Sequence, residues 1–383
     1  MNSVLIVSFF DWDTSVEIPF LFSKAGSKVD VFCKKGAWLQ SNSYYNNFIE
    51  GSENLDEFVK KLLKQIESSN YDFVVITEDP LLKFVNEQII DPTLFIKTLP
   101  LIKIENRDMI SSKNGFSKFC FDNNVLTPKS DSYNSKADYR RIIETLNFPL
   151  IQKSESGWGG MGISIIQNEL ALQKALENQI DHQNLMLQEF IEGEEVGVEA
   201  LYYKGKLIVY FCAKVLSYTT DKFSFSTRRV YYNNPDIEIY LTQLGEKTGA
   251  NGFASVTYIK ENSTSKYFVI EMDLRPNSWM AYSQYFSDNN FITAIKSINS
   301  KKEFQNPCAV LFKNEIEIGL FYKDLYRAIF KKDIKGILRW IFNYKNYWRF
   351  LPFHDLKLTK RIISQLWAET VLFKWRKWTG YYK

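Results

Sequence analysis

Phe148-Pro-Leu-Ile-Gln-Lys153, followed directly by Ser154-Glu-Ser-Gly-Trp-Gly-Gly-Met-Gly162, is the most informative stretch of this 383-residue sequence. The first six residues predict a strand, and the alternating residues 163–166 after the glycines predict another. The glycines therefore lie in a strand-loop-strand hairpin and do not open a helix. This excludes a P-loop, which needs GxxxxGK[ST] with a helix after it.

The loop has a composition that suits phosphate binding. Its glycines leave backbone N–H groups open to phosphate oxygens, and Lys153 supplies a cation beside them. Glycines also occur in plain hairpin turns, so this interpretation depends on the rest of the sequence. Trp158 at the loop tip either caps a nucleotide or substrate, or packs against its own hairpin.

A second polar motif, Glu271-Met-Asp-Leu-Arg275, ends the predicted strand 267–271. Glu271 and Asp273 are two residues apart, so on a strand they point the same way. Paired carboxylates of this kind can share Mg²⁺ ions bound to phosphates, although the same pattern is common on solvated faces. Arg275 continues the face and can bind a phosphate or carboxylate in bidentate fashion.

In this order, over about residues 100–295, these motifs resemble the ATP-grasp superfamily. The strand ending at Lys153 looks like the lysine-bearing strand of the family, Lys113 resembles its earlier nucleotide-binding lysine, and residues 187–195 look like its adenine-binding hinge. The resemblance implies ATP with Mg²⁺ or Mn²⁺. The nucleotide contacts that it implies are Lys113, Lys153, Ser156, Gly157, Trp158, Gly159, Gly160, Gly162, Gln188, Glu189, Phe190, Ile191, Glu195 and Lys214.

Residues 271–275 are similar to the metal motif of the family, Glu-x-Asn-x-Arg, with Asp273 in the Asn position. The resemblance implies that Glu271 and Asp273 bind the metal and that Arg275, with Lys153, serves catalysis. One strand earlier, Thr257 stands where the family usually has another acid. Two outcomes follow: an active enzyme with a reduced metal site, or a catalytically silent module that binds nucleotide or bridges partners.

Residues 1–100 predict a small βαβ domain with strands at 3–9, 28–33 and 71–77 and a helix at 55–68. It lacks a GxGxxG turn and so a dinucleotide fingerprint, but it resembles the preATP-grasp domain of carboxylate-amine ligases. We therefore expect an α/β and α+β chain: a preATP-grasp domain (1–100), a two-subdomain ATP-grasp core (101–300) and a basic, aromatic helical region (301–383).

The resemblance also implies a reaction. ATP would phosphorylate a substrate carboxylate to an acylphosphate, which an amine, or alternatively a thiol, attacks with release of ADP and phosphate. Whether the chain forms a homo-oligomer stays open.

Charge is segregated along the chain. Residues 313–383 hold 16 Lys and Arg against 6 Asp and Glu, a net +10, whereas the first 312 residues carry −6. Residues 334–342 and 358–378 predict amphipathic helices. Three interpretations compete: packing on the core, peripheral contact of residues 333–383 with the inner membrane surface, and nucleic-acid binding. Nucleic acid is not expected, because no recognised binding module accompanies the charge. Membrane contact would suggest a lipid-linked or cell-surface precursor as the carboxylate substrate, instead of a free small molecule.

Targeting signals are not evident in the sequence. The N-terminus lacks a basic stretch and a long apolar run, and no segment reaches about eighteen apolar residues. Four widely spaced cysteines and two histidines predict reduced thiols and no zinc site. The sequence thus predicts a cytoplasmic protein.

Overall fold

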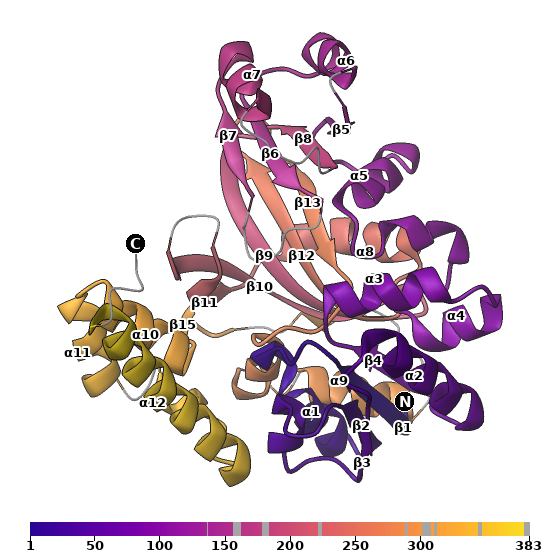
Figure 1. Cartoon of the computed structure of the whole chain (residues 1–383), viewed down its shortest axis with the longest axis vertical. Coiled ribbons are helices and arrows are strands. Elements are labelled where there is room, and N and C mark those ends of the chain that lie inside the picture. The colour runs from indigo at the N-terminus through magenta and orange to yellow at the C-terminus, as the bar shows by residue number, and fades with distance from the viewer. Residues whose placement is uncertain are drawn as a thin grey trace.

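A parallel sheet forms the N-terminal part of the computed structural model (Figure 1). Its strands follow the order β3-β2-β1-β4. Strands β1 and β4 are almost wholly buried, as apolar strands covered on both faces require. The strands are β1 (Ser3–Ser8), β2 (Lys28–Cys33), β3 (Asn47–Glu50) and β4 (Phe73–Ile76), and the helices are α1 (Ile18–Lys24), α2 (Leu55–Ser68), α3 (Asp79–Gln88) and α4 (Pro92–Thr98).

The structure describes residues 1–378 apart from 136, 156–161, 178–183, 221–223, 287, 289, 301–307, 310–311 and 344–346. The side chains of 308, 309, 322, 349 and 369–378 are also outside the description.

A small antiparallel sheet, in the order β5-β8-β6-β7, stands at the top of Figure 1. Two helices pack on it around Ile142, Leu150, Leu172 and Leu187. Strands β6 and β7 are paired, which confirms the predicted strand-loop-strand arrangement. The elements are α5 (Lys113–Asp122), β5 (Ser130–Tyr133), α6 (Asp138–Thr145), β6 (Leu150–Ser154), β7 (Ser164–Ile166), α7 (Glu169–Glu177) and β8 (Leu185–Glu189).

A larger, mainly antiparallel sheet, in the order β13-β12-β9-β10-β11-β15, lies below it. Alternate residues of its strands enter two different cores: Val198 and Tyr202 pack with α8, and Leu201 packs with α1 and α9. The elements are β9 (Gly193–Tyr203), β10 (Lys206–Tyr218), β11 (Ser226–Tyr232), α8 (Glu238–Thr248), β12 (Gly252–Glu261), β13 (Tyr267–Asp273), α9 (Phe291–Asn299), β14 (Cys308–Ala309) and β15 (Ile316–Gly319). Both cores extend into the N-terminal sheet, so the N-terminal domain and the large sheet fold as one body.

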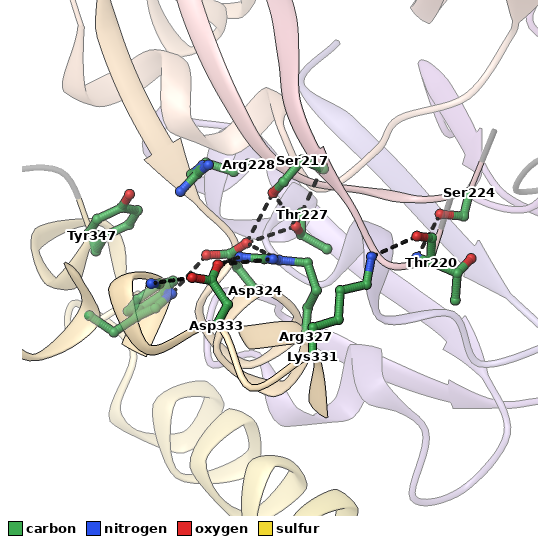
Figure 2. Close-up of polar contacts among 12 residues, drawn as sticks. Ser217, Thr220, Ser224, Thr227, Arg228, Asp324, Arg327, Lys331, Asp333 and Tyr347 are labelled. Atoms are coloured by element: carbon green, nitrogen blue, oxygen red, sulfur yellow. Dashed lines mark hydrogen bonds and ion pairs between the residues drawn. The ribbon is translucent and has the colours of Figure 1, made fainter. Parts of the chain in front are cut away.

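Three C-terminal helices follow the large sheet: α10 (Phe321–Phe330), α11 (Ile334–Phe342) and α12 (Leu356–Trp378). Helix α10 packs on β11, α11 packs on α10, and α12 packs on α10 and on Trp38 of the N-terminal domain. Asp324 of α10 is buried, and its carboxylate accepts hydrogen bonds from Thr227 Oγ1 on β11 (2.8 Å) and from Trp340 Nε1 on α11 (2.9 Å), with Arg327 Nε at 3.0 Å. Figure 2 shows Thr227, Asp324 and Arg327 where the helices meet the strands. Of the three interpretations of the basic region, packing on the core holds for the buried faces of these helices.

Candidate active site

Lys153 is the centre of a polar cluster between the two antiparallel sheets. It lies near the end of β6 with its side chain buried, and its Nζ donates to Gln188 Oε1 of β8 at 2.9 Å. Pairing of Ile151 with Gln188 puts Gln188 and Lys153 on one face of the small sheet. Burial lowers the pKa of Lys153, and Lys113 lowers it further, while Glu271 and Glu195 oppose the shift. The pKa of this one ammonium group thus depends on charged residues from α5, β9 and β13 as well as on its own burial.

Lys113 begins helix α5, directly after the N-cap Ser112. The Glu155 carboxylate, which opens the glycine loop, accepts hydrogen bonds from Ser112 Oγ and from the Asn114 backbone N–H. A helix N-terminus favours an anion in this place. Glu155 therefore attaches the start of the loop to the helix that carries Lys113. Nothing in the residues around Glu155 indicates this role.

Residues 187–195, the predicted adenine-binding hinge, form several contacts within the protein. Gln188 is buried and binds Lys153. The Glu189 side chain accepts from both the backbone N–H and the amide of Asn147 at 2.8 Å, and the Phe190 N–H donates to the Pro149 carbonyl at 2.9 Å. Ile191 follows at the turn into β9 and is half-buried. These contacts hold the chain between the two sheets in one position.

Glu271 and Asp273 share one face at the end of β13, because Glu271 pairs with Thr257 and Asp273 with Ser255 on β12. Arg275 Nη2 donates to Asp273 at 2.9 Å, and the same guanidinium forms an ion pair with Asp79 at the start of α3. Burial raises the pKa of Asp273, with Asp79 and Glu271 adding to the shift and Arg275 opposing it. The site thus contains more carboxylates than sequence reasoning found.

Glu199 on β9 continues the row formed by Ser255 and Asp273. It is fully buried and accepts from Arg229 Nη1 at 2.8 Å and from Asn277 Nδ2 at 2.7 Å. Asn277 also donates to Ser255 Oγ at 3.1 Å. This network fixes the chain that leaves Arg275.

Comparison with known proteins identifies the domain around Lys153. The model of a family described as an ATP-grasp domain matches residues 110–278. These residues are an ATP-grasp domain. Comparison with curated proteins finds no match.

Solved structures share the fold over most of the chain. The N5-carboxyaminoimidazole synthetase of Staphylococcus aureus, complexed with ADP, is 15% identical with a TM-score of 0.63, over 87% of this chain and 86% of that chain. The biotin carboxylase domain of Hydrogenobacter thermophilus 2-oxoglutarate carboxylase is 13% identical with a TM-score of 0.62, over 82% and 73%. The L-amino acid ligase of Bacillus licheniformis is 16% identical with a TM-score of 0.57, over 78% and 74%.

The glycine loop of the ATP-grasp domain is described only at its ends. The predicted contacts Ser156, Gly157, Trp158, Gly159 and Gly160 lie outside the described residues. Gly162 has a φ of +77°, and a Cβ there would come within 3.0 Å of the Ser154 Cβ. A side chain at this position would therefore strain the closing turn of the hairpin.

Lys214 does not lie with the other predicted contacts of the ATP-grasp domain. Strand alternation puts it with Tyr210 and Cys212 on the face of β10 that packs toward α8, whereas Glu271 and Thr257 are on the opposite face of the sheet. Its Nζ forms an ion pair with Glu194 and lies 4.8 Å from the ring centre of Tyr232. We therefore leave Lys214 out of the site.

The acidic end of the ATP-grasp domain has the ligands that a metal ion needs only in part. Among the described residues, no three His, Cys, Asp or Glu side chains are grouped to hold an ion. Mg²⁺, however, is commonly bound by one or two carboxylates together with phosphate and water. Glu271 and Asp273 supply two, and a bound cation would offset both the burial and the repulsion by Asp79 and Glu271 that raise the pKa of Asp273. These residues fit a Mg²⁺ shared with a phosphate ligand.

A cavity of about 60 Å³ adjoins Asn277 at the junction of the ATP-grasp domain with the N-terminal domain and the C-terminal helices. An ion pair of 2.9 Å between Asp13 and Lys323 of α10 crosses this junction. Thr14 Oγ1 and Glu17 Oε1 are buried here with no hydrogen-bond partner among the described residues. The walls are mainly apolar, including Tyr282, Phe321 and Phe350. Apolar walls with a few buried polar groups are typical of small-molecule sites.

Proposed function

We propose that this protein is an ATP-dependent ligase that activates a carboxylate as an acylphosphate and joins it to an amine. The observation that carries the proposal is the convergence of Lys113, Gln188, Glu195 and Glu271 on the buried ammonium of Lys153 within an ATP-grasp domain. A buried lysine and a half-buried lysine beside carboxylates suit a Mg-nucleotide, whose phosphates carry the charge opposite to the ammonium groups.

Each part of the site has a role in this proposal. Lys113 and Lys153 offset the charge of the ATP phosphates, and the glycine loop covers them. Gln188, Glu189, Phe190 and Ile191 form the adenine side, and Glu195 binds the ribose hydroxyls.

Glu271 and Asp273 would hold Mg²⁺ or Mn²⁺, which supplies positive charge to the phosphates during transfer. Arg275, held by Asp79 and Asp273, orients the phosphoryl group or the carboxylate through its planar donors. The guanidinium of Arg275 stays charged because both of its ion-pair partners are carboxylates. Burial lowers the pKa of Arg275, but the charges of Asp79 and Asp273 outweigh burial and raise it.

The reaction then proceeds in two displacements. A carboxylate oxygen of the substrate attacks the γ-phosphorus of ATP, and the bond to the ADP oxygen breaks. The amine nitrogen attacks the carbonyl carbon of the acylphosphate, the bond to phosphate oxygen breaks, and the amine loses a proton to solvent. Closure of the loop would keep water from the acylphosphate.

We place the small-molecule substrate in the cavity beside Asn277. Asn277 lines this cavity and is bound to Ser255, which pairs with Asp273 across the strands. A substrate there would approach the acidic end of β13 from the side of the N-terminal domain.

A catalytically silent nucleotide-binding module is the second candidate. Thr257 favours it, because a hydroxyl stands opposite Glu271 where a further carboxylate would strengthen metal binding. The two candidates differ in turnover: the silent module holds ATP without consuming it.

Release of ADP with a panel of carboxylates and amines tests the proposal. We expect Mg²⁺-dependent release by the wild type and its loss in Lys153→Met and Glu271→Gln. Lys214→Met is the matched control, since it removes a lysine from the other face of the large sheet, and it should keep full activity. Activity that survives both site substitutions contradicts the assignment.

A further inference from the structure

Helix α11 presents an apolar stripe to solvent. Ile334, Leu338, Ile341 and Phe342 recur at helical spacing, and all four are exposed, with Phe342 at 78%. At 3.6 residues per turn they occupy a sector about 100° wide. Gly336 and Trp340, on the opposite side of the helix, are buried. The helix is therefore apolar on both the side that packs and the side that faces water.

At the end of α10, separated from α11 by the turn 331–333, Ile329 and Phe330 are also exposed. We call these six residues the docking face: Ile329, Phe330, Ile334, Leu338, Ile341 and Phe342. Several large apolar side chains exposed on neighbouring turns of a soluble protein are typical of an interaction site.

The orientation of α11 is fixed, so the stripe cannot turn inward. Asp333 caps the helix by accepting from the Gly336 N–H at 2.9 Å, and Arg327 pairs with the same carboxylate (Figure 2). Trp340 Nε1 donates to the buried Asp324 at 2.9 Å. Three contacts thus hold the buried side of α11 against α10 and leave the docking face outward.

Exposed cations accompany the docking face. Lys332, Lys335 and Arg339 are exposed, helix α11 contains no Asp or Glu, and Asp333 at its N-cap is paired with Arg327. A two-fold contact between two copies of this face would bring the same positive charges together, which disfavours a second copy as the occupant. An apolar stripe rimmed by Lys and Arg is instead the pattern of a helix lying in the interface of an anionic bilayer.

We propose that the α10–α11 docking face binds an anionic lipid membrane and holds the protein at its surface. Apolar side chains of the face would enter the headgroup boundary, and Lys332, Lys335 and Arg339 would contact lipid phosphates. Within the ranges that the structure describes, no helix has the length and apolarity needed to cross a bilayer. This docking is peripheral, and it is independent of the proposed ligase activity.

Flotation of the full chain with vesicles tests the docking. One set contains one-third phosphatidylglycerol in phosphatidylcholine, and the other phosphatidylcholine alone. We expect the wild type to float with the anionic set and to be released by high salt. Lys335→Gln with Arg339→Gln should weaken binding about 30-fold, since each basic residue contributes about 1 kcal/mol near such a surface. Ile334→Ser with Leu338→Ser and Phe342→Ser should reduce it at least about tenfold.

Matched controls separate the docking face from general stickiness. Ile90→Ser with Phe121→Ser removes apolar side chains that are 89% and 80% exposed elsewhere, and Lys60→Gln with Lys64→Gln removes exposed cations from α2. Both controls should float like the wild type.

The proposal is overturned if the wild type stays in the soluble fraction with both vesicle sets, or if controls and face variants lose binding equally. A wild-type dimer in sedimentation that the serine variant makes monomeric would assign the face to self-association instead. The Gln pair, which keeps every apolar contact, decides the matter should the serine variant fold poorly.

Discussion

Glu17 gives the most quantitative prediction from the structure. It lies before α1 at the cavity, where its Oε1 has no hydrogen-bond partner among the described residues and the nearest base, His354 Nε2, is 3.7 Å away. Burial raises the pKa of Glu17 from 4.5 to about 8, and the charge of Asp355 adds to the shift. The folded protein therefore holds this carboxyl in its neutral form at pH 7.

This raised pKa makes stability depend on pH. Between pH 4.5 and 8 the unfolded chain has lost the Glu17 proton while the folded chain keeps it, so the free energy of unfolding falls as the pH rises. At 1.36 kcal/mol per pH unit, the whole interval corresponds to at most about 5 kcal/mol. The stabilisation is complete below pH 4.5, decreases through this window and is lost above pH 8.

Glu17→Gln removes the titration and keeps the shape of the side chain. We expect the wild type to be progressively less stable than the variant from pH 5 to pH 9, as measured by denaturant unfolding at each pH. Taking the difference between the two proteins cancels His354, whose pKa is lowered by burial. Glu67→Gln, at an exposed position on α2, is the control. Parallel curves for the wild type and Glu17→Gln would refute the reasoning.

Three further substitutions test other contacts. Asp324→Asn leaves the buried Arg327 with only the partly exposed Asp333 as a carboxylate partner and should lower the free energy of unfolding by about 3 kcal/mol in urea titrations. Arg275→Lys, whose single ammonium cannot bridge Asp79 and Asp273 as a guanidinium does, should reduce kcat at least about tenfold with an unchanged circular dichroism spectrum. Glu155→Gln removes an anion from the N-terminus of α5, a contribution of about 1 kcal/mol, and should raise the KM for ATP about fivefold in steady-state kinetics. Unchanged values would show that these contacts carry none of the assigned roles.

Much of the fold follows from periodicity. The strand at 28–33 and the helices at 55–68 and 334–342 were predicted with the bounds of β2, α2 and α11, because each has a clear apolar pattern. Strands β3 and β11 were missed. Asn47–Glu50 is short and partly exposed, and Ser226–Tyr232 contains two arginines that form ion pairs with Glu317 and Glu199 from other strands.

The candidate site also has residues that the sequence predicts and residues that only the folded structure brings in. Lys153 and Gln188 belong to continuous motifs, and the structure brings them together. Asp79 forms an ion pair with Arg275 because the N-terminal domain packs beside the large sheet. The residues around Asp79 in the sequence do not indicate this contact. Lys214 was assigned to the site by its place in the chain, but its side of the sheet depends on the register of β10.

Trapping of the acylphosphate tests the central claim most directly. Hydroxylamine replaces the unknown amine and converts an activated carboxylate to a hydroxamate, so the assay needs only ATP, Mg²⁺ and a carboxylate panel. We expect hydroxamate and ADP in equal amounts from the wild type and from Lys214→Met, and none from Lys153→Met. Tight ATP binding by the wild type with no hydroxamate and no ADP from any carboxylate would contradict it and establish the silent module.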